Sequence, residues 1–285
     1  MVTAMRVRRE PLDRLIPMRV VRFSAGEDPL YGVLVGNVDD QGIPDEDAKI
    51  VALTGDPLYV GVHLSPKEYA LDDVRLLAPI LPRSKVVGIG KNYAAHAAEM
   101  GGEVPTEPLM FIKPNTSVIG PNDPVFYPEQ SSEVHYEGEL AVVIGRICKD
   151  VPAEKAADVI WGYTVGNDVT ARDLQRKDGQ FTRAKGFDSF CPLGPWVETE
   201  LTLEQVGNLK VQTWLNGDLK QDGNTNQMVF DVPALIAHVS SVMTLLPGDV
   251  ILTGTPEGVG PMGVGDEVEV FVEAIGSLTN KVVKR

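Results

Sequence analysis

The segment EGELAVVI, residues 137–144, places two carboxylates at the head of an apolar run. In a β-strand, side chains two positions apart point to the same face, so Glu137 and Glu139 are expected side by side. Gly138 would face the other way and leave room for a neighbouring backbone. Two adjacent carboxylates repel each other, so on a buried face they must share a proton or bind a cation. The alternative is an edge strand on which both glutamates face solvent.

Asp168 is a third acid that could join them. It follows the strand-like residues 161–165 within the sequence GND, residues 166–168, where a strand is expected to end. Three carboxylates suit a hard cation such as Mg²⁺ or Mn²⁺. His135 could extend the face of Glu137 or stand exposed at the start of a strand. The four histidines show no His-x-His spacing, which disfavours a cupin-like iron site.

Short runs rich in Val, Ile and Thr fill most of the chain, and 28 glycines and 21 prolines separate them. They predict strands, among them residues 140–144, 162–165, 209–215, 250–252 and 268–272. An alanine-rich helix is predicted over residues 93–100, with Asn92 as its N-cap and Gly101-Gly102 as its stop, and a second helix over residues 232–245. The sequence therefore predicts an α+β protein that is mainly β.

A change of composition near residues 72–84 indicates two domains. The segment LLAPILP, residues 76–82, leads from an acidic region without motifs into the region that holds every candidate site residue. We expect a small α+β domain over residues 18–75 and a catalytic domain over residues 76–285. Residues 1–17 would be an N-terminal extension, because Met18 resembles a natural start.

The chain of 285 residues carries 26 Lys and Arg against 40 Asp and Glu, a net charge of −14. Nucleic acids and anionic membrane surfaces would repel so acidic a protein, so neither is an expected partner. A hydrophobic fraction of 43% is typical of a globular protein with a sizeable core. The sequence shows no membrane-spanning apolar run, no secretory signal and only two cysteines, so we expect a cytoplasmic protein.

A histidine and a glutamate stand three residues apart in GIGKNYAAHAAE, residues 88–99. The glycines do not indicate a dinucleotide site, because the third glycine of that motif and its distant acid are missing. On a helix, His96 and Glu99 would share one face. A carboxylate beside an imidazole raises its basicity and fixes its tautomer, as a general base for water requires. The alternative is an ordinary surface contact between the two side chains.

The segment DVTARDLQRKDGQFTRAKGFD, residues 168–188, has five bases and four acids within a strongly acidic chain. If a helix turns here, Asp168, Arg172 and Gln175 share a face, and Lys185 could reach a bound anion. The alternative is a solvated loop of mixed charge. Residues 253–260, TGTPEGVG, form a glycine-rich turn without the ending of a phosphate-binding loop, which leaves the Thr255 hydroxyl as a donor to a small ligand.

In this order along the chain, the motifs closely resemble those of the fumarylacetoacetate hydrolase family, from residue 76 to the end. The matching segments are GKNY (90–93) with His96 and Glu99, FIKP (111–114), EGEL (137–140), GNDVTARDLQ (166–175), RAKGFD (183–188), LLPGD (245–249) and TGTPEGVG (253–260). The resemblance implies a catalytic domain built as a mixed β-sandwich roll, a small variable N-terminal domain, and a homodimer.

The resemblance also implies roles for these residues. Glu137, Glu139 and Asp168 would bind Mg²⁺ or Mn²⁺, and His96 and Glu99 would form a water-activating pair on a lid-like segment. Lys185 would be catalytic, and the residues that would contact substrate oxygens are Arg172, Gln175 and Thr255. The expected substrate is a small anionic 2-oxo acid whose enolate the metal stabilises.

Three reactions share that enolate and stay open. The expected reaction cleaves a C–C bond, by hydrolysis of an acylpyruvate or by decarboxylation of oxaloacetate. The alternative is isomerisation in aromatic catabolism of 2-hydroxyhepta-2,4-diene-1,7-dioate or 5-carboxymethyl-2-hydroxymuconate. A protein of another class, a metal-binding β domain without turnover, would keep His96 and Glu99 remote from the carboxylates.

Overall fold

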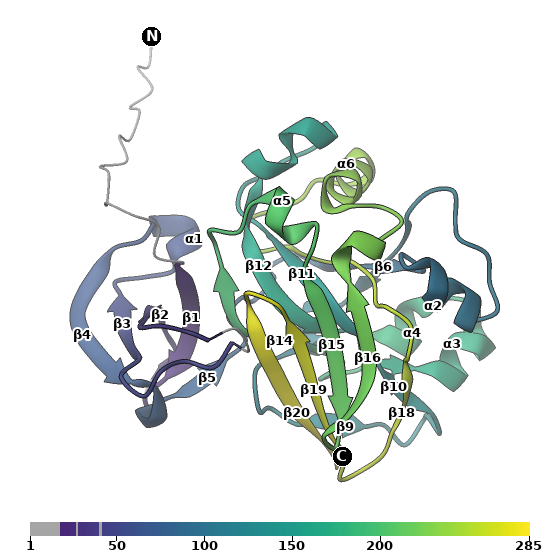
Figure 1. The fold of residues 1–285 in the computed structure, drawn as a ribbon, viewed down its shortest axis with the longest axis horizontal. Helices are drawn as coiled ribbons and strands as arrows, with labels where there is room; N and C mark the ends of the chain where they lie inside the picture. Colours follow the sequence, from purple (N-terminus) through teal and green to yellow (C-terminus); the bar gives the residue numbers. More distant parts are fainter. Residues whose placement is uncertain (1–17, 27, 40–41) are drawn as a thin grey trace.

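The computed structural model describes residues 18–26, 28–39 and 42–285. The predicted N-terminal extension, residues 1–17, lies outside the described residues. Strands dominate the described chain and the helices are short, which confirms the prediction of a mainly β protein. A small lobe that contains β1 to β5, α1 and η1 lies beside a larger body that contains the other elements (Figure 1).

The small lobe is built from antiparallel strands. Its elements are β1 (Arg19–Ser24), β2 (Leu30–Val35), β3 (Lys49–Leu53), α1 (Pro57–Val60), β4 (Leu64–Ala70), η1 (Leu71–Asp73) and β5 (Arg75–Leu77). The strand order is β4-β3-β2-β1, and β5 also pairs with β1. Because β1 pairs with β14 of the larger body as well, one sheet runs through both parts. The proposed division between residues 75 and 76 falls inside β5, after its first residue.

The larger body packs this sheet against a second one. The large sheet continues from β1 through β14 (Cys191–Glu198), β12 (Ile160–Asn167), β11 (Gly138–Ile144), β17 (Val250–Leu252) and β6 (Val86–Gly90) to β7 (Leu109–Lys113), with β8 (Val118–Ile119) beside β14. The second sheet runs through β16 (Asp218–Asn224), β15 (Lys210–Leu215), β19 (Glu267–Val272), β20 (Gly276–Lys284) and β9 (Val125–Tyr127). A smaller sheet consists of β13 (Thr170–Ala171), β10 (Val134–Tyr136) and β18 (Gly260–Met262).

Contacts of β15, β19 and β20 with β11, β12 and β14 form the expected β-sandwich. The predicted strands at residues 140–144, 162–165, 209–215, 250–252 and 268–272 correspond to β11, β12, β15, β17 and β19.

Helices cover the outside of the body. They are α2 (Ala94–Glu99), α3 (Arg172–Asp178), α4 (Phe181–Lys185), α5 (Leu203–Val206) and α6 (Val232–Val242), with short turns η2 (Asn115–Ser117), η3 (Ala153–Asp158) and η4 (Thr225–Gln227). In Figure 1, α2, α3 and α4 lie on the side of the body far from the small lobe.

Both predicted helices are present, with changed ends. The later one, α6, stops at Val242 and not at residue 245. The N-cap of α2 is Tyr93, so the prediction of Asn92 as N-cap is wrong. The Asn92 side chain instead donates to the Thr253 carbonyl (2.7 Å) and accepts from the Phe230 amide (2.9 Å). The Asn92 side chain is thus occupied by hydrogen bonds to distant parts of the chain and does not cap the helix.

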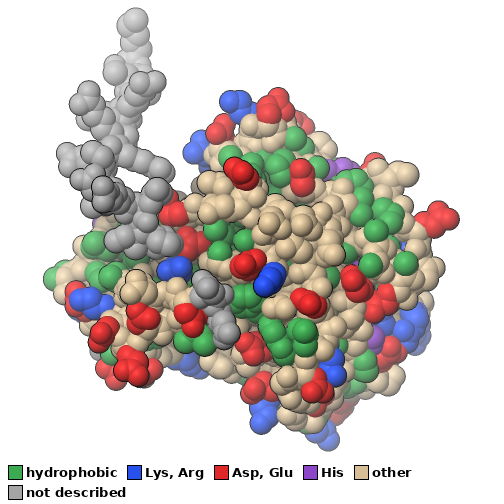
Figure 2. Space-filling model, viewed as in Figure 1, with side chains coloured by type: hydrophobic (Ala, Val, Ile, Leu, Met, Phe, Trp, Pro, Cys, Tyr) green, Lys and Arg blue, Asp and Glu red, His purple; other side chains and the backbone are tan. Residues whose placement is uncertain are grey.

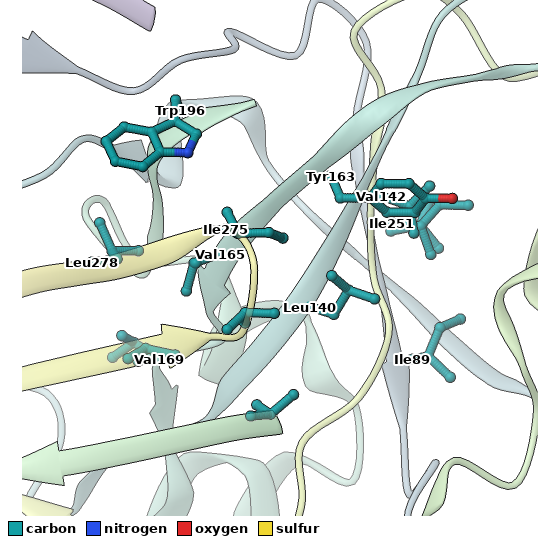
Figure 3. Packing of buried hydrophobic residues seen from close by; sticks show 14 of the residues in the cluster. Ile89, Leu140, Val142, Tyr163, Val165, Val169, Trp196, Ile251, Ile275 and Leu278 are labelled. Carbon is teal, nitrogen blue, oxygen red and sulfur yellow. The ribbon is translucent and has the colours of Figure 1, made fainter. Parts of the chain in front are cut away.

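Both faces of β11 are buried. Leu140 and Val142 point into the main core between the sheets (Figure 3), whereas the residues that alternate with them pack in a second cluster. Gly138 faces the second sheet, and a Cβ added there would lie 2.3 Å from Thr213 Oγ1. The missing side chain of Gly138 therefore makes room for side chains of the second sheet. The expectation of a close neighbouring backbone is wrong at this position.

Acidic side chains are spread over the described part of the face drawn in Figure 2, and basic side chains do not gather into a broad patch there. No helix of the described residues is both long enough and apolar enough to cross a membrane. The structure contains a single chain, so the expected homodimer stays a prediction.

Candidate active site

Three carboxylates meet at one end of the β11–β12 pair. Glu137 and Glu139 flank Gly138 at the start of β11, and Asp168 follows the last residue of β12. The register pairs Gly138 with Asn167, which brings the two strand ends together. One ligand oxygen from each acid can be chosen so that all lie within 4.8 Å of one another, and each residue is at most 4% exposed. The alternative in which the glutamates face solvent is therefore wrong.

Basic side chains surround these acids. Lys185 Nζ lies 2.6 Å from Glu137 Oε2 and 2.5 Å from Asp168 Oδ2. Lys113 Nζ lies 2.6 Å from Asp168 Oδ1, and Arg172 forms an ion pair with Glu137. Burial alone would lower the pKa of Lys185, but the adjacent Asp168 and Glu137 outweigh burial and raise it. The Lys185 ammonium is therefore charged at neutral pH.

Lys113 is not among the predicted site residues. It is fully buried on β7 at the end of the strand-like run LMFIK, residues 109–113, and it belongs to the segment FIKP, residues 111–114, that resembles the family. Its partner Asp168 lies 55 residues away along the chain. A pattern confined to neighbouring residues cannot show such a pair.

Glu139 differs from the other two acids, because no described cation forms an ion pair with it. Its Oε2 accepts a hydrogen bond from the Gly254 amide (2.7 Å). Burial raises the pKa of Glu139 well above its usual range, and the nearby Asp168 and Glu137 raise it further. For Glu137, in contrast, burial raises the pKa, but the adjacent Lys185 and Arg172 together with His96 outweigh burial and lower it.

The cluster fits a hard divalent cation. It offers oxygen ligands from three buried acids, and one of them, Glu139, forms no ion pair with a basic side chain of the described residues. Glu137, Glu139 and Asp168 could therefore hold Mg²⁺ or Mn²⁺.

His96 and Glu99 meet on α2. His96 Nδ1 lies 3.2 Å from Glu99 Oε2, and Glu99 Oε1 accepts a hydrogen bond from the Gly258 amide (3.0 Å). His96 is buried, so the pair is more than a contact between two surface side chains. A proton held on Nδ1 by Glu99 leaves Nε2 as the proton acceptor of the ring.

A cavity of about 260 Å³ connects these groups. Its lining contains every predicted site residue except Glu99: His96, Glu137, Glu139, Asp168, Arg172, Gln175, Lys185 and Thr255. The other lining residues are Ile89, Gly90, Lys91, Met100, Phe111, Arg176 and Phe181. A larger cavity of about 970 Å³ is lined by residues of β1, β14 and β15 and contains none of the predicted site residues. We therefore place the candidate site in the smaller cavity.

The helix α3 carries Arg172 and Gln175 into this cavity. It begins at Arg172, so Asp168 precedes the helix and does not share its face. Arg172 Nη1 donates to Gln175 Oε1 (2.6 Å), which leaves the Gln175 amide NH₂ for another acceptor.

Thr255 is buried at the wall of the cavity. Its hydroxyl donates to the Gly138 carbonyl (2.9 Å) and accepts from the Gln221 side chain (2.7 Å). The hydroxyl thus fastens the glycine-rich turn to β11, and its predicted substrate contact stays a prediction.

His135 is buried in β10, where its Nε2 lies 3.0 Å from Glu133 Oε1. The expectation of an exposed histidine is wrong, because β13 and β18 flank β10 on both sides. Within the described chain, the potential metal ligands form a cluster of acids that does not include His135.

Comparisons with known proteins cover both parts of the chain. Residues 85–283 match the family model described as fumarylacetoacetate (FAA) hydrolase C-terminal, and residues 18–79 match the one described as Rv2993c-like, N-terminal. Protein Rv2993c of Mycobacterium tuberculosis is 52% identical over 272 residues, which cover 94% of this chain and 99% of that protein. The mitochondrial oxaloacetate tautomerase fahd2 of Xenopus laevis is 46% identical over 290 residues, covering 94% of this chain and 91% of that protein.

Solved structures are similar over the same extent. A 5-carboxymethyl-2-hydroxymuconate delta-isomerase of Mycobacterium smegmatis has a TM-score of 0.85 at 49% identity and covers 94% of this chain and 100% of its own. A maleylpyruvate hydrolase of Sphingobium sp. SYK-6, in complex with manganese(II) and pyruvate, has a TM-score of 0.74 at 33% identity. The match covers 94% of this chain and 99% of that one.

Proposed function

The chain belongs to the fumarylacetoacetate hydrolase family, and from this membership we propose that it is a metal-dependent tautomerase of small 2-oxo acids. The reaction would move a proton between C3 and the C2 oxygen. The observation that carries the proposal is the convergence of the three acids, Lys185 and His96 on one cavity. Relatives named as an oxaloacetate tautomerase and a delta-isomerase favour a proton shift over the C–C cleavage that the sequence motifs first suggest.

Lys185 would stabilise the charge that this reaction creates. Loss of a C3 proton puts negative charge on the C2 oxygen, and catalysis requires groups that bind this oxygen more tightly as its charge grows. Lys185 donates N–H groups to Glu137 and Asp168, and its third N–H has no acceptor among the described residues. A Mg²⁺ or Mn²⁺ ion held by Glu137, Glu139 and Asp168 would supply Lewis-acid stabilisation of the substrate oxygens.

The remaining groups would position the substrate and move the proton. His96 Nε2 can accept and return a proton at C3, because Glu99 engages Nδ1 and holds the ring. The free amide NH₂ of Gln175, which Arg172 holds in place, would bind the substrate carboxylate.

Hydrolysis of an acylpyruvate is the second candidate, because the His96–Glu99 pair could equally activate a water molecule. The similarity to a maleylpyruvate hydrolase supports it. A metal-binding domain without turnover would keep His96 remote from the acids, whereas His96 lines the same cavity as they do.

A panel of substrates tests the proposal on protein loaded with Mg²⁺ or Mn²⁺. Enol-to-keto conversion of oxaloacetate is followed by ultraviolet absorbance, pyruvate release from oxaloacetate and acetylpyruvate by a coupled assay, and isomerisation of 2-hydroxyhepta-2,4-diene-1,7-dioate by product analysis. We expect tautomerisation to be the fastest reaction and to be lost in Lys185→Met. The control Lys177→Met removes an exposed lysine of α3 and should leave the activity unchanged.

Pyruvate release from acetylpyruvate distinguishes the second candidate, because hydrolysis produces pyruvate and tautomerisation does not. His96→Ala should abolish that hydrolysis and spare the decarboxylation of oxaloacetate, which needs no activated water. Failure of the folded, metal-loaded protein to convert any compound would refute the proposed enzyme.

A further inference from the structure

Lys91 is the basic residue of the cavity lining that forms no ion pair with a carboxylate of the described residues. The other lysines and arginines of the lining are paired with acids: Arg172 with Glu137, Lys185 with Glu137 and Asp168, and Arg176 with Glu133. Among the described residues, no ion pair or hydrogen bond engages the Lys91 ammonium. Because an unpaired ammonium at a cavity wall attracts anions, Lys91 is available to an acidic ligand.

The local structure keeps the Lys91 side chain at this place. Lys91 has a φ of +56°, in the left-handed region that residues other than glycine rarely adopt. A Cβ added to Gly102 would lie 2.4 Å from Lys91 Nζ, so the ammonium rests against Gly102, shortly after α2. A strained backbone is thus combined with space that a glycine leaves for the ammonium. Both features define where the ammonium lies.

The charges of the site indicate which ligand this is. Three acids of the cluster are matched by three buried cations: Lys113, Lys185 and Arg172. A divalent ion would add two positive charges. The enolate of a 2-oxo acid carries two negative charges, one on its carboxylate and one on the C2 oxygen. A second carboxylate on the substrate therefore needs one further cation, and Lys91 is the unpaired one in the lining.

We propose that Lys91 binds the distal carboxylate of the substrate, so that the enzyme selects 2-oxo dicarboxylates over 2-oxo monocarboxylates. The inference rests on the proposed function, which defines the end of the substrate that the acids, Lys185 and His96 act on. Lys91 sets specificity and takes no part in the proton transfer.

The test uses two pairs of compounds that differ at the distal end. They are oxaloacetate with 2-oxobutanoate, and 2-oxoglutarate with 2-oxopentanoate. For the full chain loaded with Mg²⁺, C3 proton exchange in D₂O is measured by NMR and corrected for the uncatalysed rate, and the Kd of each compound is measured by calorimetry.

Lys91→Gln should lower the ratio of kcat/KM for the dicarboxylate over the monocarboxylate by about tenfold, chiefly through KM. Lys91→Arg should restore most of the ratio. Lys177→Gln makes the same charge change at an exposed site on α3 and should leave the ratio unchanged. Gly102→Ala would displace the ammonium without removing its charge and should lower the ratio by a smaller factor.

An equal loss toward both members of a pair in Lys91→Gln, or no loss, would overturn the inference. If the unsubstituted protein exchanged no C3 proton of any compound, the proposed function would fail. Calorimetry would still test whether Lys91 binds the distal carboxylate. The inference is supported if the unsubstituted protein binds each dicarboxylate more tightly than the matching monocarboxylate and Lys91→Gln removes this difference. Equal Kd values of the unsubstituted protein for the dicarboxylate and the monocarboxylate of a pair would overturn it.

Discussion

Replacement of Lys113 by methionine tests the charge arrangement of the site. Lys113 is fully buried, and its Nζ donates to Asp168 Oδ1 (2.6 Å) and to the Val169 carbonyl (3.3 Å). Removal of one partner from a buried ion pair costs about 3–5 kcal/mol. Asp168 keeps Lys185 at 2.5 Å, so we expect Lys113→Met to lower the free energy of unfolding by about 3 kcal/mol, the lower end of that range.

In a protein of this size each kcal/mol lowers Tm by about 2–4 °C, so the Tm of Lys113→Met should fall by about 6–12 °C. Urea and thermal unfolding are measured with and without Mn²⁺. Added Mn²⁺ should restore part of the loss, because an ion at the acids replaces the missing positive charge beside Asp168. Lys177→Met is the control and should change the stability by less than about 0.5 kcal/mol.

A Lys113→Met loss below about 1 kcal/mol would refute the reasoning, since Asp168 would then not need this counter-ion. A loss that Mn²⁺ leaves unchanged would count against a cation bound at Asp168.

Glu139→Gln should abolish Mn²⁺ binding in calorimetry. It should also stabilise the metal-free protein by about 1–2 kcal/mol, because it removes a buried carboxylate that has no ion-pair partner among the described residues. A destabilised variant would contradict this. Gly138→Ala should cost about 1–3 kcal/mol, since its Cβ would clash with the second sheet, and an unchanged urea midpoint would oppose this account. The Asn216 side chain and the Gly263 amide donate to Asp266 and lower its pKa. The stabilisation by Asp266 is therefore complete above the usual aspartate pKa and lost as pH falls through the lowered value. The stability difference between the unsubstituted protein and Asp266→Asn should thus shrink on acidification in urea unfolding, and a growing difference would reverse the argument.

The strands and the acid cluster are predictable from the sequence because their signals are local. Runs of Val and Ile define β11 and its neighbours, and the spacing of Glu137 and Glu139 together with Asp168 at a strand end indicates the cluster. The i, i+3 spacing likewise predicts the contact of His96 with Glu99, which the structure confirms.

Features that depend on distant partners are not predictable in this way. Asn92 has the sequence context of a helix cap, yet it bonds to Thr253 at the far end of the chain. Lys113 has no local sign of its ion pair with Asp168. His135 is buried because strands from elsewhere in the chain flank it. In each case tertiary contacts, and not the neighbouring residues, decide what the side chain does.

Trimming the small lobe from the chain would break the pairing of β1 with β14. Arg19 in β1 pairs with Glu198 in β14, and β14 also pairs with β12, the strand that ends before Asp168. Without β1, this part of β14 would become a bare edge, and such edges pair with other chains and aggregate. Glu198, which is 1% exposed, would also lose Arg19. We therefore expect a protein shortened to residues 76–285 to precipitate, and a chimaera that exchanges the lobe for that of a relative to remain in solution.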